Sequence, residues 1–161
     1  MTIDKQALLE KLRAQISSEI ERGTRAAKDA AAAATHEENK AEGDKDTRAT
    51  EASYVARGQA ERVRELESAL VKLAAMPVKA FSTADRTSAS AVVVVDDGKR
   101  KVTYFLVTAA GGIALEAGEL RLQTLATTSP LGAALLGLGE GDEAEFTTPQ
   151  GMKTYVLESV R

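Results

Sequence analysis

The first half of the chain carries apolar residues three or four positions apart, the spacing that places side chains along one face of an α-helix. Two series follow this spacing, Leu9, Leu12, Ile16 and Ile20 first, and Val63, Leu66, Leu70 and Leu73 later. Residues 1–76 also lack proline and are rich in Ala, Glu, Lys and Arg, which favour helices. We therefore predict an antiparallel coiled-coil hairpin of two helices over residues 1–76, with its tip near residues 36–53. Thr2 is expected to cap the first helix, and Asp4 to favour its positively polarised end.

The pattern changes at Pro77, which ends the second helix. Beyond it the period falls to two and β-branched residues become frequent, and strands are predicted at residues 92–95, 102–107, 144–147 and 153–160. The first two segments flank Asp96-Asp97-Gly98-Lys99, and the last two flank Thr148-Pro149-Gln150-Gly151. Each pair is therefore predicted to form a β-hairpin.

A short helix is predicted between these two hairpins. Ser129 is placed to cap it, Pro130 takes its first position, and Gly137 ends it. Residues 77–161 should then form a second domain, a twisted antiparallel sheet with one helix packed on it. The chain as a whole is expected to belong to the α+β class.

The composition narrows the functions open to this chain. Its 161 residues include no cysteine and one histidine, which excludes thiol catalysis and metal sites built from several such residues. A formal net charge of −3 does not favour direct binding to nucleic acid. Aromatic residues make up 4% of the chain, which is few for an aromatic-lined pocket. Without a signal-peptide core or a run of about 20 apolar residues, we expect a cytoplasmic protein that does not contact a membrane.

The predicted tip of the hairpin is rich in charge. Residues 36–51 hold six acidic and three basic residues, and Gly43 lies where a turn is easiest to make. A charged run of this kind is usually a solvated surface. By itself it indicates no function.

The last third of the chain contains an ordered series of short motifs. They are Ser129-Pro130, Ala134-Leu135, Gly137, Gly141-Asp142, Pro149-Gln150-Gly151 and Tyr155. In this order and after a long helical hairpin, the series resembles the bacterial GreA/GreB transcript-cleavage factors. The resemblance implies an FKBP-like fold for residues 77–161. It also implies that this domain docks on RNA polymerase, with Ser129, Pro130 and Leu131 as the docking residues.

The same resemblance implies how such a chain acts. In the GreA/GreB family the coiled coil enters the secondary channel of RNA polymerase, where acidic residues at its tip help to hold a second Mg²⁺ ion. Carboxylates are the ligands that Mg²⁺ prefers, and two-metal phosphodiester cleavage depends on such ions. The factor itself would be an accessory protein with no active site, no cofactor and no stably bound metal of its own. Any Mg²⁺ would be shared transiently with the polymerase.

The tip departs from the family pattern, which runs Gly-Asp-x-x-Glu-Asn-Ala-Glu-Tyr. Here the corresponding stretch starts at Gly43-Asp44 and reaches Tyr54, and no register supplies the Asp-x-x-Glu pair. The acids available for Mg²⁺ assistance are Asp44, Asp46 and Glu51. Stimulation of cleavage and a regulatory role without cleavage both remain open.

Two other functions remain open from the sequence. A coiled-coil scaffold would use the hairpin to bind a partner other than polymerase. A peptidyl-prolyl isomerase would use the FKBP-like fold, although most aromatic residues of the second half occupy strand positions expected in the core. Nucleic acid is expected to be met only indirectly, through the polymerase, and the chain is expected to be a monomer or weak oligomer.

Overall fold

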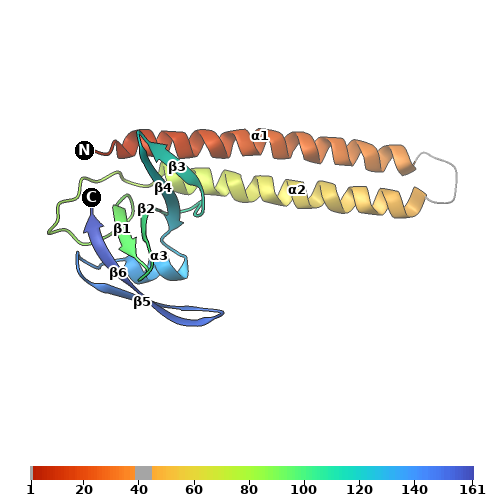
Figure 1. Ribbon diagram of the computed structural model, residues 1–161. Helices are drawn as coiled ribbons and strands as arrows, with labels where there is room; N and C mark the ends of the chain where they lie inside the picture. The colour runs from red at the N-terminus through yellow and green to blue at the C-terminus, as the bar shows by residue number, and fades with distance from the viewer. Residues whose placement is uncertain (1, 39–44) are drawn as a thin grey trace. The chain divides into compact units, whose positions relative to one another are not determined.

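The computed structural model describes residues 2–38 and 45–161, and for residues 37, 38, 45 and 46 it describes the backbone alone. The elements are α1 (Lys5–Glu38), α2 (Lys45–Ala74), β1 (Val92–Asp96), β2 (Lys101–Val107), β3 (Ala114–Ala117), β4 (Leu120–Ala126), α3 (Pro130–Leu135), β5 (Glu143–Thr148) and β6 (Gly151–Val160) (Figure 1). The predicted α+β class, a helical hairpin followed by a sheet domain with one helix, is confirmed.

The chain divides into two compact units. One unit is residues 14–70, and the other joins residues 1–13 to residues 71–161. The predicted domain boundary between residues 76 and 77 concerns which parts fold independently, and it stays a prediction. The first turns of α1 and the last turn of α2 pack in the same unit as the sheet. We call this unit, residues 1–13 and 71–161, the sheet unit.

The unit of residues 14–70 consists of the two long helical arms. Ile16 and Leu66, from the two predicted apolar series, are both buried. Further along, small residues replace large ones, and Ala34 and Ala49 are buried instead. The arms approach closely at Gly23, where an added Cβ would lie 2.9 Å from Cγ2 of Val63. Large apolar side chains thus hold one end of this unit, and alanines let the helices meet nearer the other.

The first helix begins differently from the prediction. The backbone N–H of Ala7 donates to Oδ1 of Asp4 at 2.9 Å, and α1 begins at Lys5. Asp4 is therefore the N-cap, and the expectation that Thr2 caps the helix is wrong. A carboxylate three residues before a free N–H satisfies that donor and also favours the positive end of the helix dipole.

The sheet has six strands in the order β3-β4-β2-β1-β6-β5. Both predicted hairpins are confirmed, as β1 with β2 and β5 with β6. Strands β3 and β4 form a third hairpin that the sequence did not indicate. The sheet is also not wholly antiparallel, because β2 pairs with β4 in parallel.

Side chains are buried on both faces of this sheet. Val93 and Val95 of β1 join the cluster that includes Leu106, Leu135 and Leu157, on the face covered by α3. Their neighbour Val92 is also buried, as is its cross-strand partner Phe105. Because successive strand residues point to opposite faces, the second face must be covered too. Buried residues available for this within the sheet unit are Leu8, Leu12, Leu73 and Met76.

One charged group lies among apolar side chains in the sheet unit. Nζ of Lys5 lies 4.4 Å from the centre of the Phe81 ring, and Phe81 itself packs against the core. No hydrogen-bond partner of this buried Nζ is found among the described residues. Burial lowers the pKa of Lys5 from its ordinary value. A cation–π contact thus ties the start of α1 to the segment after α2.

Candidate functional site

The described part of the hairpin tip is mostly exposed helix surface. Asp44 lies outside the described residues, and of Asp46 only the backbone position, in the first turn of α2, is described. Glu51 is exposed on the same helix. Positions 46 and 51 are five residues apart, which separates them by about 140° around a helix axis. Their helical positions therefore do not share one face as residues three or four apart would.

Apolar and aromatic side chains project from α2 just beyond Glu51. Tyr54 is 66% exposed and Val55 is 54% exposed. The guanidinium carbon of Arg57 lies 5.9 Å from the centre of the Tyr54 ring. Most of the surface of Tyr54 and Val55 is left open by the described part of the chain, so it is available to a partner.

No site for a resident metal is formed by the described side chains. Within residues 2–38 and 45–161, no group of three or more His, Cys, Asp or Glu side chains is arranged to hold an ion. This includes Glu51, which among the three predicted tip acids is the one whose side chain is described.

Ser129, Pro130 and Leu131 open helix α3 and take three different environments. The Ser129 hydroxyl donates to the carbonyl oxygen of Ala126 at 2.7 Å and accepts from the N–H of Gly132 at 3.1 Å. It is the predicted N-cap, with Pro130 at the first helical position. Leu131 is buried in the core, whereas Pro130 is exposed. Two of the three expected docking residues therefore serve the fold.

The glycine in this short helix is required by space. A Cβ added to Gly132 would overlap the carbonyl oxygen of Ala126 and lie 2.9 Å from Oγ of Ser129. The serine cap and the glycine thus form one structural unit, in which α3 begins directly against the end of β4. A short motif of this kind identifies the fold more directly than it identifies a contact with a partner.

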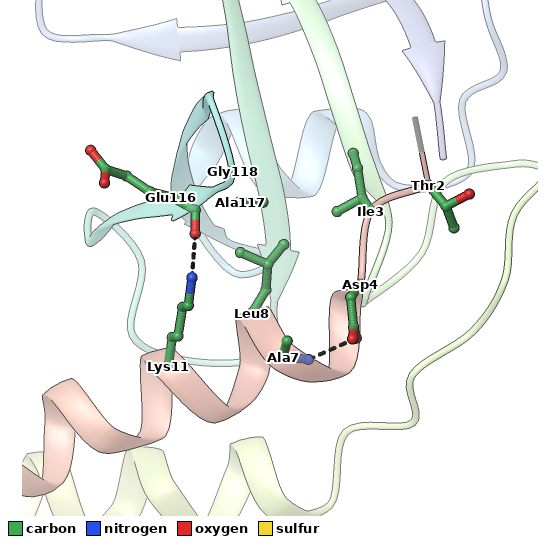
Figure 2. A pocket seen from close by; sticks show the side chains of 9 residues that line it. All are labelled: Thr2, Ile3, Asp4, Ala7, Leu8, Lys11, Glu116, Ala117 and Gly118. Carbon is green, nitrogen blue, oxygen red and sulfur yellow. Dashed lines mark hydrogen bonds between the residues drawn. The ribbon is translucent and has the colours of Figure 1, made fainter.

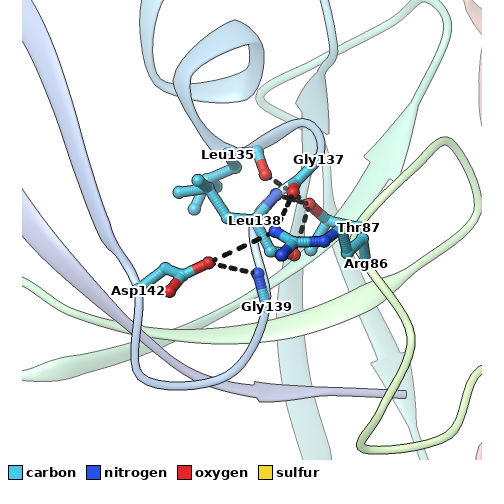
Figure 3. A network of polar contacts seen from close by, with 7 residues as sticks. All are labelled: Arg86, Thr87, Leu135, Gly137, Leu138, Gly139 and Asp142. Atoms are coloured by element: carbon cyan, nitrogen blue, oxygen red, sulfur yellow. Dashed lines mark hydrogen bonds and ion pairs between the residues drawn. The ribbon is translucent and has the colours of Figure 1, made fainter.

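The loop after α3 is fixed by residues from a segment far earlier in the chain (Figure 3). The buried hydroxyl of Thr87 lies within hydrogen-bond distance of the carbonyl oxygens of Leu135 and Leu138, the latter at 3.2 Å. It also accepts from the N–H of Leu138 at 3.1 Å. Gly137, with a φ of 78°, donates its N–H to the carbonyl of Thr87 at 2.9 Å. The turn that ends α3 is therefore held by a single buried side chain and its backbone.

A charged pair lies at the edge of the same network. Nη1 of Arg86 donates to the carbonyl of Gly137 at 2.8 Å and lies 3.7 Å from Oδ2 of Asp142. Asp142 in turn accepts from the N–H of Gly139 at 2.8 Å. Arg86 and Thr87 lie in an irregular segment with no sequence signal, so the sequence did not single them out. Asp142 belongs to the Gly141-Asp142 motif, which therefore has a role in holding this loop.

The shifted pKa values of the sheet unit also have structural causes. Backbone N–H groups of Arg100 and Lys99 lower the pKa of Asp97 in the turn between β1 and β2. A hydrogen bond from Lys101 to Glu158, at 2.6 Å, raises the pKa of that lysine. Burial raises the pKa of Tyr104. Turn hydrogen bonds, one ion pair and burial in the fold thus account for these three shifts.

None of α1, α2 and α3, over the residues described, carries an apolar stretch that would span a bilayer. The structure consists of a helical hairpin and a six-stranded sheet with one helix. Near its tip the hairpin has exposed apolar and aromatic side chains, whereas the motif residues Ser129 and Leu131 of the sheet unit stabilise the fold. This architecture is that of a coiled-coil hairpin followed by a sheet domain with one helix.

Comparison with known proteins finds similarity to one family. The model of the transcription elongation factor GreA/GreB C-terminal domain matches residues 83–161. GreA of Paracoccus denitrificans is 33% identical over 100 residues, covering 62% of this chain and 60% of that protein. GreA of a Sulfurovum species is 35% identical over 101 residues, covering 62% of this chain and 58% of that protein. Over residues 83–161, the chain thus carries a domain similar to the C-terminal domain of the GreA/GreB factors.

The alignment spans about three fifths of the length of these curated relatives. Among solved structures, Gfh1 (GreA factor homolog 1) of Thermus thermophilus is 15% identical, with 92% of this chain and 94% of that chain covered and a TM-score of 0.39. Thermus aquaticus Gfh1 is 22% identical, with 97% and 95% covered and a TM-score of 0.40. TM-scores below 0.5 do not establish a common fold, so the description of the fold rests on this structure alone.

Proposed function

We propose that this chain is a transcription elongation factor that binds RNA polymerase and acts through its secondary channel. The observation that carries the proposal is the match of residues 83–161 to the GreA/GreB C-terminal domain, directly after a long helical hairpin. The sheet domain would dock on the polymerase, and the hairpin tip would reach toward its active centre. The factor would modulate the chemistry of the polymerase and perform none itself.

The proposed docking surface is the exposed side of α3. Since Ser129 is used as a cap and Leu131 is buried, Pro130 is the expected docking residue that remains free to touch a partner. Ala133 is exposed three residues later on the same helix, and Leu136 follows at 41% exposed. Residues three apart on a helix are neighbours on its surface. The three therefore offer a small apolar stripe for docking.

The proposed role of the tip is to occupy the channel and alter the polymerase without supplying the acid pair of the family. Support comes from the sequence, which has no Asp-x-x-Glu pair in residues 43–54, and from the separation of positions 46 and 51 around α2. Catalytic groups must be placed within about 0.5 Å to be effective. Asp44, Asp46 and Glu51 would at most share a transient Mg²⁺ ion with the polymerase.

Binding is tested by co-purification of the chain with core RNA polymerase. The proposal expects a complex that survives gel filtration, and expects Pro130→Asp with Leu136→Asp to weaken it. Both residues are exposed, so the charges should leave the fold intact, which circular dichroism would check. If the folded wild-type chain does not bind polymerase, the alternative of a scaffold for another partner replaces the proposal.

The role of the tip is tested by a transcript-cleavage assay on backtracked polymerase. We expect the wild type to add little cleavage and Asp44→Ala with Asp46→Ala to change that level little, while both proteins still bind. Strong cleavage by the wild type that the double variant abolishes would assign Mg²⁺ assistance to these acids. Thr47→Glu places a glutamate three residues after Asp44 and so restores the family pair. This variant should raise cleavage if the position of the second acid is what the wild type lacks.

The remaining parts of the proposal follow from action on polymerase. The chain would be found in the cytoplasm, would need no cofactor, and would meet nucleic acid only through the polymerase. It would act as a monomer or weak oligomer. A proline-isomerisation assay on a short peptide should show no activity, and measurable activity would favour the isomerase alternative.

A further inference from the structure

The two edges of the sheet differ in whether other parts of the sheet unit cover them. Strand order places β3 at one edge and β5 at the other. An edge strand presents unpaired backbone groups to which another chain can bond, and proteins usually cover such edges. Whether each edge is covered therefore indicates which one can bind a partner.

The edge at β3 is covered by the start of helix α1 (Figure 2). Nζ of Lys11 donates to the backbone carbonyl of Glu116 at 2.8 Å. The first turns of α1 and the end of β3 enclose a pocket of about 250 Å³, lined by Thr2, Ile3, Asp4, Ala7, Leu8, Lys11, Glu116, Ala117 and Gly118. A lysine that is hydrogen-bonded to an edge carbonyl prevents a further strand from pairing there. This edge is closed by the chain itself.

The register of the last hairpin shows which backbone groups of β5 are free. Thr148 pairs with Gly151 across the two-residue turn Pro149-Gln150. Residues that flank such a turn bond to each other, and bonded pairs then recur at every second residue. The N–H of Leu157 donates to the carbonyl of Asp142 at 2.9 Å, which fits this alternation at the far end. The N–H and C=O groups of Glu145 and Thr147 must therefore point away from β6, toward the free edge.

The side chains on this edge define the kind of strand it would accept. Glu143, Glu145 and Thr147 are exposed on one face of β5, and their cross-strand partners Val156, Thr154 and Met152 are exposed beside them. No ion pair to Glu143 or Glu145 is found within the described residues. Two such carboxylates on alternate positions complement a strand with basic side chains on alternate positions. Met152, 70% exposed, adds apolar surface next to them.

A second copy of this chain is not the partner that the edge fits. Two β5 strands paired antiparallel about Glu145 would place this residue opposite its counterpart. Like charges directly opposite each other destabilise a strand pair. The carboxylates therefore act against self-association, as charged side chains on natural edge strands do.

We propose that the free edge of β5 binds an extended polypeptide segment with lysine or arginine at alternate positions, which adds a strand to the sheet. The backbone groups of Glu145 and Thr147 would bond to the added strand, and Glu143 and Glu145 would pair with its basic side chains. Backbone bonds provide affinity in this mode of recognition and side chains provide specificity. The inference does not depend on polymerase binding, because it rests on the register and charge of this strand.

The test uses the full chain and a ten-residue peptide of alternating lysine and threonine with blocked ends. Amide hydrogen exchange is followed by NMR with and without the peptide. In the free protein we expect fast exchange at Glu145 and Thr147 and slow exchange at Phe146, whose N–H bonds to β6. The peptide should slow exchange at Glu145 and Thr147 at least tenfold, and this effect should weaken as salt is added.

Two variants of one residue separate backbone bonding from charge. Thr147→Pro removes an outward N–H and leaves the backbone bonds to β6 and both carboxylates in place, and both variants lose the hydroxyl that donates to Sδ of Met152 at 3.6 Å. Thr147→Val keeps that N–H and serves as the matched control. We expect Thr147→Pro to weaken peptide binding at least tenfold and Thr147→Val to leave it unchanged, with the Phe146 amide protected in both.

Three results would overturn the proposal. The first is peptide binding that is equal in Thr147→Pro and wild type, since it would be charge attraction alone. The second is the absence of any protection at Glu145 and Thr147 when the peptide is present. The third is protection of these amides in the protein alone that grows with protein concentration, which would make a second copy the occupant.

Discussion

In the sheet unit Ser129, Gly132 and Thr87 each perform a defined backbone task, whereas Glu51 and Tyr54 project from α2 into solvent. The first group is constrained by the chain itself. The second makes few contacts with the described part of the chain, such as that of Tyr54 with Arg57. This difference explains why the similarity to the GreA/GreB factors lies in the sheet domain, while the proposed activity depends on the tip. The following changes should have large effects in the first region and small ones in the second.

The largest effect is expected from emptying the core beneath α3. Leu135 is fully buried and Leu136, its neighbour, is 41% exposed. Leu135→Ala should lower the free energy of unfolding by about 3 kcal/mol through lost burial and a residual cavity. Leu136→Ala should lower it by less than about 1 kcal/mol. Urea unfolding of the two variants measures the difference, and similar losses would show that α3 is not packed as described.

A glycine tests whether the Ser129 motif is structural. Replacing glycine by alanine inside a helix normally stabilises it, by about 1 kcal/mol. At Gly132 the sign should reverse, with a loss of about 2 kcal/mol, because the new methyl group would overlap the Ala126 carbonyl. Ala133→Gly, one position along on the exposed side, is the control and should cost about 1 kcal/mol from propensity alone. A stabilised Gly132→Ala variant, measured by thermal unfolding, would contradict the structural role of the motif.

The buried hydroxyl of Thr87 should matter slightly less. Thr87→Val keeps the shape of the side chain but leaves the N–H of Leu138 and the carbonyl of Leu135 without this partner. The expected loss is about 1.5 kcal/mol, the cost of leaving buried polar groups unsatisfied. Thr108→Val removes a hydroxyl that bonds the Lys72 carbonyl at 3.1 Å in a more open position, and should cost under about 0.5 kcal/mol. Equal losses in chemical unfolding would mean that Thr87 does not organise the loop.

A smaller, pH-dependent effect is expected in the turn between β1 and β2. Asp97 has a pKa below its ordinary value because it accepts from the backbone N–H groups of Arg100 and Lys99. A carboxylate whose pKa is lowered by folding stabilises the fold above its unfolded pKa, and this contribution is lost as pH falls through the folded value. Wild type should therefore exceed Asp97→Ala in stability at about pH 6, well above the unfolded pKa. Melting temperatures should converge toward about pH 2, and a constant gap would mean that the charge is irrelevant.

The smallest effects on stability are expected near the tip. Glu51→Ala and Tyr54→Ala should each leave the free energy of unfolding within about 0.5 kcal/mol of the wild type, because both side chains are exposed. Their effect should appear in polymerase assays instead. A loss of stability comparable to that of Thr87→Val would show that the tip is constrained by the chain after all.

The sequence predicted those parts of the fold that depend on local pattern. The apolar series of Ile16 and Leu66 indicated the helical arms, and the turn residues around Gly98 and Gly151 indicated two hairpins. The third hairpin, residues 114–126, was missed because Ala, Leu, Glu and Gln make up most of it and give little strand signal, and β3 exists through its pairing with β4. The parallel pairing of β2 with β4 joins segments separated by a third strand, which local periodicity does not reveal.

The residues of the candidate site likewise divide into those that local sequence predicts and those that depend on distant partners. The cap by Ser129 was predicted because it needs only neighbours in sequence, and the structure adds that this role and the burial of Leu131 leave Pro130 for docking. Arg86 and Thr87 could not be predicted, because their partners lie about fifty residues away. The roles of Asp44, Asp46 and Glu51 depend on a second molecule and stay predictions.

The most direct test of the account exploits the absence of cysteine from the chain. Glu51→Cys would carry an iron chelate that cuts nearby polypeptide, and Met152→Cys on the exposed face of β6 would be the matched control. In complex with core RNA polymerase, the probe at residue 51 should cut polymerase segments around the catalytic Mg²⁺, and the probe at residue 152 should cut elsewhere. A stable complex in which residue 51 gives no cuts near the active centre would contradict entry of the hairpin into the secondary channel.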